Sequence, residues 1–416
     1  MIKMIPEGWV KIKLGDIGKF STSSVDKKSI EGEEEVCMLN YMDIYNHSTL
    51  TEDYPFEKVT APRKQVLSSS VQRGDVFFTP SSETPDDIGH SAVFIGDLEN
   101  IVHSYHTIRF RSVSNEYLDD HFKSHVFQGV DTYEYFRKRA SGSTRFTLSL
   151  PVFNELELTV PSLPEQKKIA SILNSVDEVI EKTQSKINKL QDLKKGMMNE
   201  LLTKGIGHTE FKDSELGRIP KSWEVKKMNS ISEVIDSLHE TPSFSDQGIA
   251  MVRVTDIKRG FLNLTKTKKV TKDTFEKFIK KYRPSVGDIV MSRVGSYGIS
   301  SFVETHEPFC MGQNTVVIHP KHINGRFLYE CLNSKLIQKQ IELEVAGSGY
   351  KSISLADIRA LTIPIPPKKE QEVIQSTLLS IDDQTICQKQ KLTQTQSLKK
   401  SLMQVLLTGK VRVKVN

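Results

Sequence analysis

The sequence predicts an α/β chain of the α+β type, in which two mixed domains lie at opposite ends of a long antiparallel two-helix coiled coil. Three observations predict this duplicated fold with its pseudo-two-fold repeat. Residues 148–203 recur at 353–408, where 20 of 56 aligned positions are identical at an offset of 205 residues. Both copies carry a heptad pattern, and each follows a stretch of mixed strand and helix patterns. A period this long is no solenoid unit, so each copy is a domain plus a helix.

The repeat extends beyond the helices. Trp9 and Trp223, the only tryptophans, each follow an Ile-Pro segment, and Gly74-Asp75 matches Gly287-Asp288. Between these anchors the two halves show no sequence resemblance, which suggests two readers of different things on one symmetric scaffold. We therefore predict a first domain at residues 1–160, a helix at 161–205, a second domain at 206–365 and a second helix at 366–416.

The first helix has the stronger coiled-coil pattern. From Ile169 its seam residues recur in 4-3-4-3 steps, and eight of the ten seam positions up to 201 are apolar. Prolines precede both helices, and Glu165 and Glu370 fall in the first turn, where the helix dipole favours a carboxylate. The apolar seam is predicted to include Ile169, Leu173, Val176, Ile180, Ile187 and Leu190.

The second helix keeps the register but places Thr385, Gln388, Thr395 and Lys399 at seam positions, so it is the weaker partner. About 38 residues at 1.5 Å per residue make a rod of roughly 55–60 Å. Two copies separated by a whole domain pair most simply as antiparallel helices. The alternative is two independent helices, each covering its own domain. The predicted apolar seam of this helix includes Ile374, Leu378, Ile381 and Leu392.

The domains contain short strand patterns between turn residues. The predicted strands are 75–79, 91–95, 107–111, 251–254, 288–292 and 315–319, and the predicted helices are 115–128 and 326–342. A chain of 416 residues has room for two or three domains. It has no apolar run of the roughly 20 residues that span a membrane and no signal peptide, so we expect a cytoplasmic protein without membrane contact.

Composition excludes several classes of site. The four cysteines show no Cys-x-x-Cys spacing, which argues against a disulfide framework or a zinc ribbon. The chain has no phosphate-binding Gly-x-x-x-x-Gly-Lys-Ser/Thr loop, no Gly-x-Gly-x-x-Gly motif after a strand, and no amino-methyltransferase tetrapeptide. His121 and His125 have the i, i+4 spacing of a metal pair but lack an accompanying glutamate. We therefore expect no catalytic residue, cofactor or metal in this chain.

Charge is unevenly distributed. Residues 1–164 contain 17 Lys and Arg against 24 Asp and Glu, whereas residues 206–365 contain 23 against 18. Much of the acidity is the run at residues 31–35, which we interpret as a solvated loop. Eight basic residues lie between Lys266 and Arg283, and either they track a phosphate backbone or they form the solvated face of an amphipathic helix.

Several residues suit contact with duplex DNA. Polar loops with a basic residue precede each repeat, at 141–145 and 347–351, and Arg, Lys, Asn and Gln have the reach to read base edges. The candidate DNA-binding residues are Asn46, Arg109, Ser143, Arg145, Arg253, Lys268, Lys269, Arg293, Gln313, Asn314, Tyr350 and Lys351.

The motifs that frame the repeat resemble a known family. Pro-x-x-x-Glu-Gln-x-x-Ile before each long helix, the closing Leu-Leu-Thr, and the segment from Phe211 to Trp223 are similar to the specificity subunits of type I restriction-modification systems. The resemblance covers nearly the whole chain. It implies a non-catalytic subunit in which each target-recognition domain reads one half of a bipartite, asymmetric DNA site.

The same resemblance implies partners. The helical rod is expected to set the gap between the half-sites and to dock two methyltransferase subunits that carry S-adenosylmethionine. Restriction subunits that use ATP and Mg²⁺ join some such complexes. The alternative function is a coiled-coil interaction protein with two domains that bind ligands other than DNA.

Overall fold

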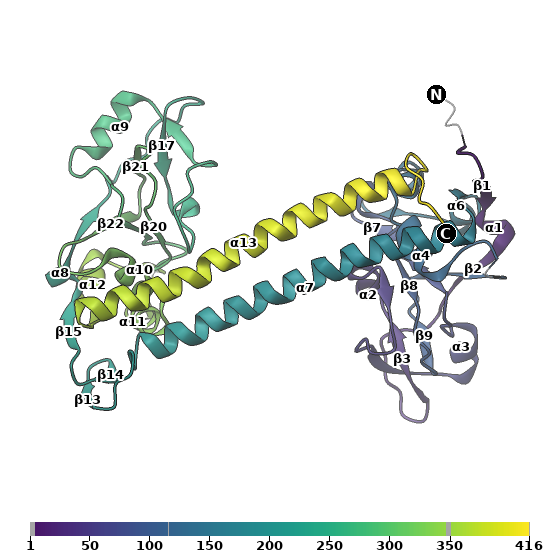
Figure 1. Cartoon of the computed structure of the whole chain (residues 1–416), viewed down its shortest axis with the longest axis horizontal. Coiled ribbons are helices and arrows are strands. Elements are labelled where there is room, and N and C mark those ends of the chain that lie inside the picture. The colour runs from purple at the N-terminus through teal and green to yellow at the C-terminus, as the bar shows by residue number, and fades with distance from the viewer. Residues whose placement is uncertain (1–4, 115, 347–350, 416) are drawn as a thin grey trace. The chain divides into compact units, whose positions relative to one another are not determined.

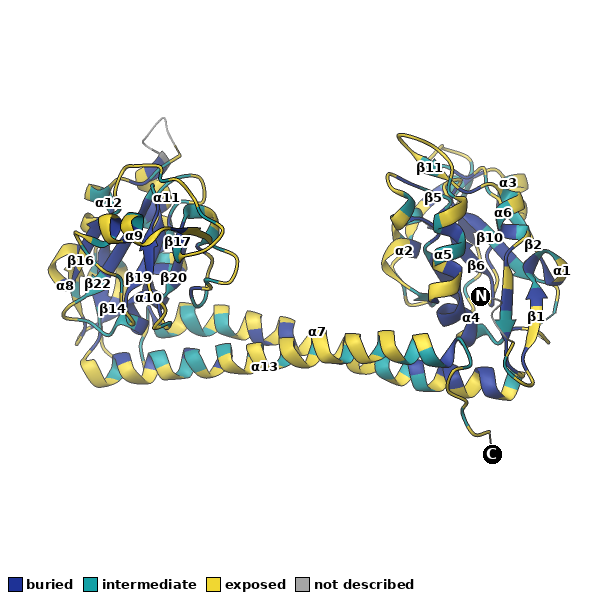
Figure 2. Ribbon diagram, turned by 90° about the horizontal axis from the view of Figure 1, so that it is seen from above, coloured by how far each residue is buried: buried dark blue, intermediate teal, exposed yellow. Residues whose placement is uncertain are grey.

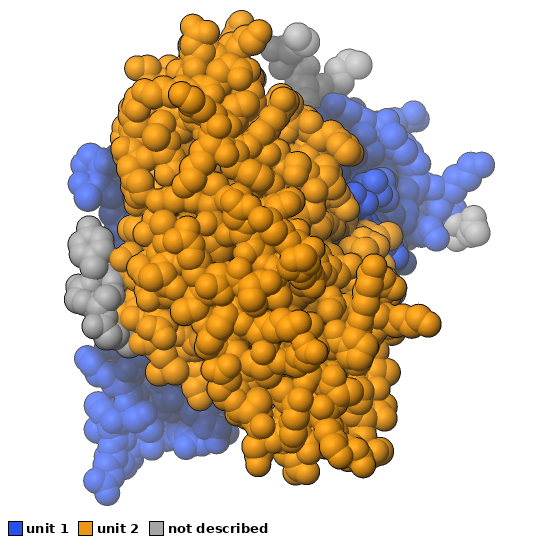
Figure 3. Space-filling view, turned by 90° about the vertical axis from the view of Figure 1, so that its left-hand side faces the viewer, with its two compact units in different colours: residues 1–184, 390–416 blue, residues 185–389 orange. Residues whose placement is uncertain are grey.

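The chain forms two compact units, each of which contains one mixed domain and half of each long helix (Figures 1 and 3). The computed structural model describes residues 5–114, 116–346 and 351–415. Unit 1 comprises Met1–Gln184 and Gln390–Asn416, and unit 2 comprises Ser185–Lys389. In the described part of the chain, no helix is both long enough and apolar enough to cross a membrane.

Unit 1 is built on two sheets. A five-stranded sheet has the order β2-β10-β6-β8-β4, and a three-stranded sheet has the order β5-β3-β9, with β3 antiparallel to β5 and parallel to β9. The five strands are Gly18–Thr22 (β2), Ile108–Ser112 (β10), Val76–Phe78 (β6), Ser91–Phe94 (β8) and Thr49–Leu50 (β4), and the three are Glu57–Ala61 (β5), Glu34–Leu39 (β3) and Ile101–His103 (β9).

Two short strand pairs complete this domain. β1 pairs with β12, which leads the chain into the first long helix, and β7 pairs with β11. These strands are Val10–Lys13 (β1), Glu157–Val160 (β12), Ser81–Ser82 (β7) and Phe146–Thr147 (β11). The helices are Leu14–Ile17 (α1), Tyr41–Asn46 (α2), Arg63–Ser68 (α3), Pro85–Asp87 (η1), Asp120–Val126 (α4), Val130–Arg139 (α5) and Leu150–Asn154 (α6).

Unit 2 repeats this topology, although its described residues contain no counterpart of the edge strand β4. Its sheets have the orders β16-β22-β19-β20 and β18-β17-β21, and β17 is antiparallel to β18 and parallel to β21, as in unit 1. The inserts that share no sequence pattern therefore share a fold. The strands are Ser232–Asp236 (β16), Thr315–Pro320 (β22), Ile289–Ser292 (β19), Ser300–Phe302 (β20), Lys268–Val270 (β18), Ile249–Val252 (β17) and Phe309–Met311 (β21).

The remaining elements of unit 2 also have counterparts in unit 1, except for an added hairpin of β13 and β14. β15 pairs with β23 as β1 pairs with β12. These elements are Phe211–Ser214 (β13), Gly217–Pro220 (β14), Glu224–Lys227 (β15), Thr362–Ile365 (β23), Met228–Ile231 (α8), Val254–Asp256 (η2), Lys272–Ile279 (α9), Gly325–Asn333 (α10), Lys335–Ala346 (α11) and Leu355–Ala360 (α12).

The two long helices are α7, Leu163–Leu201, and α13, Lys368–Leu406. They pack as antiparallel partners within each unit, as the ion pair Asp177–Lys399 in unit 1 and the ion pair Lys194–Asp382 in unit 2 show. The predicted coiled-coil pairing is confirmed, and the helices are not independent. Prolines precede α13 as expected, and Pro161 precedes α7. Pro164 lies inside the first turn of α7, where the missing N–H costs nothing.

The predicted seam positions alternate with exposed ones along both helices (Figure 2). Of the predicted apolar set, Val176, Ile180 and Leu392 are half-buried and the others are buried. The ends of the helices enter the domain cores. Leu406 and Leu407 pack with Trp9 in unit 1, and Leu202 packs with Trp223 in unit 2.

The predicted strands form close to their expected bounds, whereas two helix predictions and one loop prediction are confirmed only in part. The segment 115–128 is helical only from Asp120, because Asp119 accepts hydrogen bonds from the N–H groups of His121 and Phe122 and so caps the helix there. The segment 326–342 breaks at Ser334, which separates α10 from α11. Glu34 and Glu35 belong to β3 and form ion pairs with Arg63 and Lys58.

Candidate nucleic-acid interface

The start of each long helix is tied to its own domain by the same glutamine. Gln166 Oε1 accepts a hydrogen bond from Asp119 N at 2.9 Å, and Gln371 Oε1 accepts one from Asn324 N at 3.1 Å. Each side-chain amide also donates to the carbonyl of the proline five residues earlier, at 2.9 Å in both cases. Asp119 and Asn324 cap α4 and α10, so the repeated Glu-Gln motif fixes the helix start to a domain helix.

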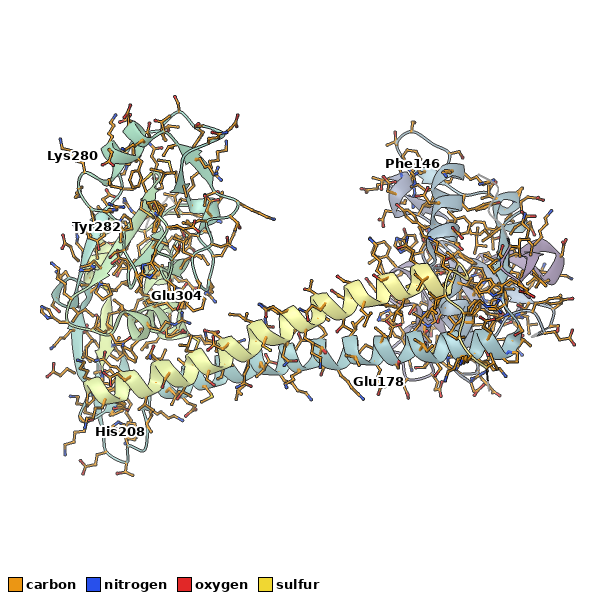
Figure 4. All side chains as sticks on the ribbon, turned by 45° about the horizontal axis from the view of Figure 1, so that its top comes forward. Phe146, Glu178, His208, Lys280, Tyr282 and Glu304 are labelled. Atoms are coloured by element: carbon orange, nitrogen blue, oxygen red, sulfur yellow. The ribbon has the colours of Figure 1, made fainter. Side chains whose placement is uncertain are left out.

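The glutamate of this motif binds the segment that follows the other long helix, with different partners in the two units. Glu165 accepts two hydrogen bonds from the Arg412 guanidinium, at 2.7 and 2.8 Å. Glu370 accepts hydrogen bonds from Trp223 Nε1 at 3.0 Å and from Ile206 N at 2.9 Å. His208 Nε2 lies 2.9 Å from the same carboxylate, beside the helix ends (Figure 4). In both units the segment that follows one helix therefore binds the start of the other.

A lysine–aspartate pair joins the two helices at equivalent positions of the repeat. Lys399 Nζ lies 2.5 Å from Asp177 Oδ1, and Lys194 Nζ lies 2.8 Å from Asp382 Oδ2. Lys194 also lies 3.3 Å from Glu330, a carboxyl whose pKa is raised by burial. The position equivalent to Glu330 in unit 1 is His125, and burial lowers its pKa. Lys399, one of the polar seam positions of the second helix, is thus held in a cross-helix ion pair.

In unit 1 the structure brings Asn46, Ser143 and Arg145 to one face. Asn46 ends α2 and is exposed, and the loop that contains Ser143 is held beside α2 by the pairing of β11 with β7. Arg145 Nη2 donates to Ser81 Oγ at 3.0 Å, and Tyr41 of α2 donates to Ser81 O at 2.9 Å. Figure 4 shows Phe146 at the base of this loop.

Tyrosines extend this face. The rings of Tyr41 and Tyr45 stack with centroids 6.2 Å apart, and Tyr45 lies against His90 with centroids 4.4 Å apart. His90 Nε2 lies 2.8 Å from Asp87 Oδ1. Tyr45 is exposed, so this face offers aromatic surface as well as hydrogen-bonding groups.

Arg109 lies elsewhere in unit 1. It is half-buried on β10, where it donates to the carbonyl of Ser70, and burial together with the neighbouring Arg111 lowers its pKa. Arg111 itself donates to Asp75 at 2.7 and 2.6 Å. The structure therefore does not bring Arg109 to the face of Asn46 and Arg145.

In unit 2 the loop between β16 and β17 gathers three of the candidate residues. Phe244 of this loop is 40% exposed, with Lys268 Nζ 4.6 Å and Arg253 Cζ 6.0 Å from its ring centre. Thr241 of the same loop donates to Gln313 Oε1 at 3.3 Å. Lys269 is exposed on β18 next to Lys268.

The remaining candidates of unit 2 differ in accessibility. Arg293 is 17% exposed, and it donates to Asp236 Oδ1 at 3.0 Å and to the carbonyl of Ile353 at 3.2 Å. Asn314 adopts a left-handed turn with φ of 61°, and its carbonyl accepts a hydrogen bond from Arg293 N. Lys351 is exposed, whereas Tyr350 lies outside the described residues.

The basic stretch from Lys266 to Arg283 contains an amphipathic helix. Phe275 and Phe278 of α9 are buried, and Tyr282 donates to Asp288 at 2.9 Å, so these aromatic rings do not face solvent between the cations. The lysine side chains are exposed, and Lys280 and Tyr282 follow α9 on one side of the unit (Figure 4). Phosphate contact by these lysines stays a prediction. In the described residues, His121 and His125 join no cluster able to hold a metal ion.

Comparison with known proteins identifies the family. A family model described as "Type I restriction modification DNA specificity domain" matches residues 6–192 and 220–396. The chain belongs to this family. The predicted resemblance to type I specificity subunits is therefore confirmed, and both units contain a specificity domain.

Relatives match along the whole chain. The MjaVIII specificity subunit of Methanocaldococcus jannaschii is 26% identical over 420 residues, which cover 99% of this chain and 94% of the relative. The MjaX specificity subunit of the same organism is 30% identical over 82% of this chain and 79% of its own length. The S subunit from M. genitalium has the same fold, with a TM-score of 0.57 at 14% identity over 97% of this chain and 99% of that one.

A second solved chain, from a study of complex assembly in the type I R-M system, gives a TM-score of 0.59 at 16% identity, with 98% of this chain and all of that one covered. Sequence reasoning missed the residues that organise the two faces, namely Tyr41, Tyr45 and Phe244. Their one signal was the presence of an aromatic residue close to polar residues in a short segment, which is too common to single them out.

Proposed function

We propose that this specificity-family chain recognises DNA as a non-catalytic subunit, with each domain reading one half of a bipartite, asymmetric site. The observation that carries the proposal is the pair of domains with one topology and different surface residues. A common fold presents both domains in the same way to a duplex. The unlike side chains then allow the two half-sites to differ in sequence.

The helix pair supports a role as spacer and docking surface. The Glu-Gln motifs and the lysine–aspartate pairs are the residues that the two units share, and two identical partners require two equivalent surfaces. We infer that two methyltransferase subunits dock on this shared part and bring S-adenosylmethionine. Restriction subunits with ATP and Mg²⁺ join where the host has them. Because the proposed target is the DNA inside the cell, we also propose that the protein is cytoplasmic.

The charges of the two domains suggest that they contribute unequally to the binding of the DNA backbone. The exposed lysines around β18 and α9 in unit 2 supply the salt-dependent contact with phosphates, whereas the equivalent β5 and α3 of unit 1 face the acidic strand β3. A bound partner compensates for the acidity of unit 1. Membership of the specificity family disfavours the alternative of a coiled-coil protein with ligands other than DNA.

Partner-dependent methylation tests the proposal. The purified chain is incubated with duplex DNA and radiolabelled S-adenosylmethionine, with and without a type I methyltransferase subunit from the same host. We expect methylation only when both proteins are present, and at a bipartite sequence. The methyltransferase alone is the control. Methylation by this chain alone, or the same sites with the methyltransferase alone, would contradict the proposal.

A further inference from the structure

Each unit has a cavity where its domain meets the long helices. The cavity of unit 1 has a volume of about 440 Å³ and is lined by the end of α2, the junction of α4 with α5, and Lys399 of α13. The cavity of unit 2 has a volume of about 900 Å³ and is lined by Arg259 and Gly260, the junction of α10 with α11, and Lys194 of α7.

These cavities occupy the same place in the repeated fold. Asp43 Oδ2 accepts a hydrogen bond from Asn40 N at 2.7 Å at the start of α2, and Asp256 Oδ2 accepts one from Arg253 N at 3.0 Å at the start of η2. Counting three residues on from Asp43 and Asp256 makes Asn46 the counterpart of Arg259.

The domain helices give the same correspondence. Asp119 caps α4 as Asn324 caps α10, so Gln128 is the counterpart of Asn333. By the same offset Tyr133 corresponds to Gln338 and Lys399 to Lys194, and all of these residues line the cavities. Equivalent residues from three separate parts of the fold therefore line both cavities, so the two cavities are equivalent sites of the repeat.

The two linings share a lysine and differ elsewhere. Lys399 and Lys194 are held by the cross-helix ion pairs, so they frame the cavity in both units. The other paired positions carry different hydrogen-bonding groups. Asn46 and Arg259 are exposed, and neither side chain has a hydrogen bond or an ion pair to another described residue.

Each cavity has unused hydrogen-bonding capacity at a second position. Gln128 is exposed, and its Nε2 donates to the carbonyl of Ser91 at 3.2 Å, which leaves its Oε1 without a partner among the described residues. Asn333 donates from its amide nitrogen to Ser300 and Tyr329, while its buried Oδ1 accepts no hydrogen bond from the described part of the chain. A buried acceptor without a donor costs free energy unless a ligand supplies the donor.

We propose that these two cavities are the base-reading sites of the two domains, with Asn46 and Gln128 reading one half-site and Arg259 and Asn333 the other. The inference rests on the proposed function. Two readers of different sequences need one geometry with interchangeable hydrogen-bonding groups, and this is what the paired linings offer. Asn46 and Gln128 suit an adenine edge, and Arg259 suits a guanine edge. Asn333 has only its Oδ1 free, which can accept a hydrogen bond from the amino group of a base.

The surroundings of the unit 2 cavity favour DNA as its occupant. Lys195, Lys335 and Lys339 are exposed on its lining and form no ion pair with the described residues, so they are available to phosphates. Identical protein partners would require matching linings, which these cavities lack. The unit 1 lining has one lysine, Lys399, against one carboxylate, Asp86. The unit 2 lining has six lysine and arginine side chains against the three carboxylates of Glu330, Glu342 and Asp382, so unit 2 supplies more of the salt-dependent affinity.

Two single substitutions test the proposal in the full complex with the methyltransferase subunit. In Asn46→Ala we expect one base position of one half-site to lose roughly 10- to 100-fold of its discrimination, while the other half-site stays strict. In Arg259→Ala we expect the same loss in the other half-site. The measurement is methylation of a DNA library in which every position of the site is randomised.

Matched controls are Lys64→Ala on α3 and Lys221→Ala in the β14–β15 turn, both exposed and outside the cavities. Unchanged half-sites in both cavity variants would overturn the inference, as would a uniform loss of methylation without loss of discrimination, which indicates a protein-docking surface. Absence of specific methylation by the wild-type complex would instead overturn the proposed function. Because Asn46 and Arg259 are exposed, thermal unfolding of both variants is expected to match the wild type.

Discussion

At the residue scale, matched sequence positions keep their place in the fold but take different partners. Asp75 and Asp288 follow the same Gly turn and are both buried. Asp75 accepts hydrogen bonds from Arg111, whereas Asp288 accepts them from Tyr282 and lies 2.8 Å from His319 Nδ1. A buried carboxylate requires donors, and each domain supplies them from its own variable residues.

His103 is expected to make unit 1 sensitive to acid. It is fully buried, and burial followed by the charges of Arg109 and Arg111 lowers its pKa from 6.5 to about 3. Below pH 6.5 the unfolded chain binds a proton that the folded chain does not, so stability falls as the pH falls towards 3. Between pH 7 and pH 5 the loss is on the order of 2 kcal/mol.

The measurement is urea unfolding of the wild type and of His103→Gln at both pH values. The glutamine can keep a hydrogen bond to Thr107 but does not titrate. Equal pH dependence in the two proteins would show that His103 is not the group responsible.

At the element scale, the ion pairs explain how a helix with a polar seam pairs correctly. In antiparallel helices, one residue number rises as its partner's falls, so facing residues of one register have a constant sum. Lys399 with Asp177 and Lys194 with Asp382 have the same sum, so both pairs belong to one register. A slip of one heptad would place Lys194 opposite Gln375 or Lys389 and leave Asp382 opposite Ile187 or Leu201. Partly buried charges without partners disfavour these registers.

A charge swap tests the pair in unit 1. Lys399→Asp sets two carboxylates against each other, and we expect it to lower the free energy of unfolding by about 1–3 kcal/mol, since the side chains of Lys399 and Asp177 are only 18% and 25% exposed. The double variant Lys399→Asp, Asp177→Lys restores opposite charges. It should recover most of the loss in thermal unfolding, and a double variant as unstable as the single one would argue against pairing.

At the scale of the whole molecule, one chain supplies both domains and both helices of the spacer. α7 and α13 are each 39 residues long, and each passes from one unit into the other. Helix length therefore enters the proposed spacing of the half-sites directly, since every residue adds about 1.5 Å.

Insertion of one heptad into both long helices tests this spacing. Inserted after residues 184 and 389, it keeps the seam in phase and adds about 10.5 Å, or roughly three base pairs at 3.4 Å each. We expect methylation mapping to show the same half-sites with a gap wider by about three base pairs. Insertion into α13 alone is the control and should abolish specific methylation. An unchanged gap in the double insertion would refute the spacer role.

The sequence by itself determined the duplication, the two long helices, their seam, the main strands and the family. These features are local or periodic, so they are readable without knowing which distant residues meet. Arg109 and Arg293 show the limit of such predictions. Arginine suits DNA contact, but these two side chains are partly buried and bind Ser70 and Asp236 of the protein itself.

Only the tertiary structure decided that two inserts without sequence resemblance share one topology. It also paired Lys194 with Asp382, and it placed Asn46 and Arg259 at one equivalent position of two cavities. The physical reason is that strand pairing and cavity lining depend on long-range contacts. Many apolar sequences satisfy the same sheet, so a common fold survives where sequence identity does not.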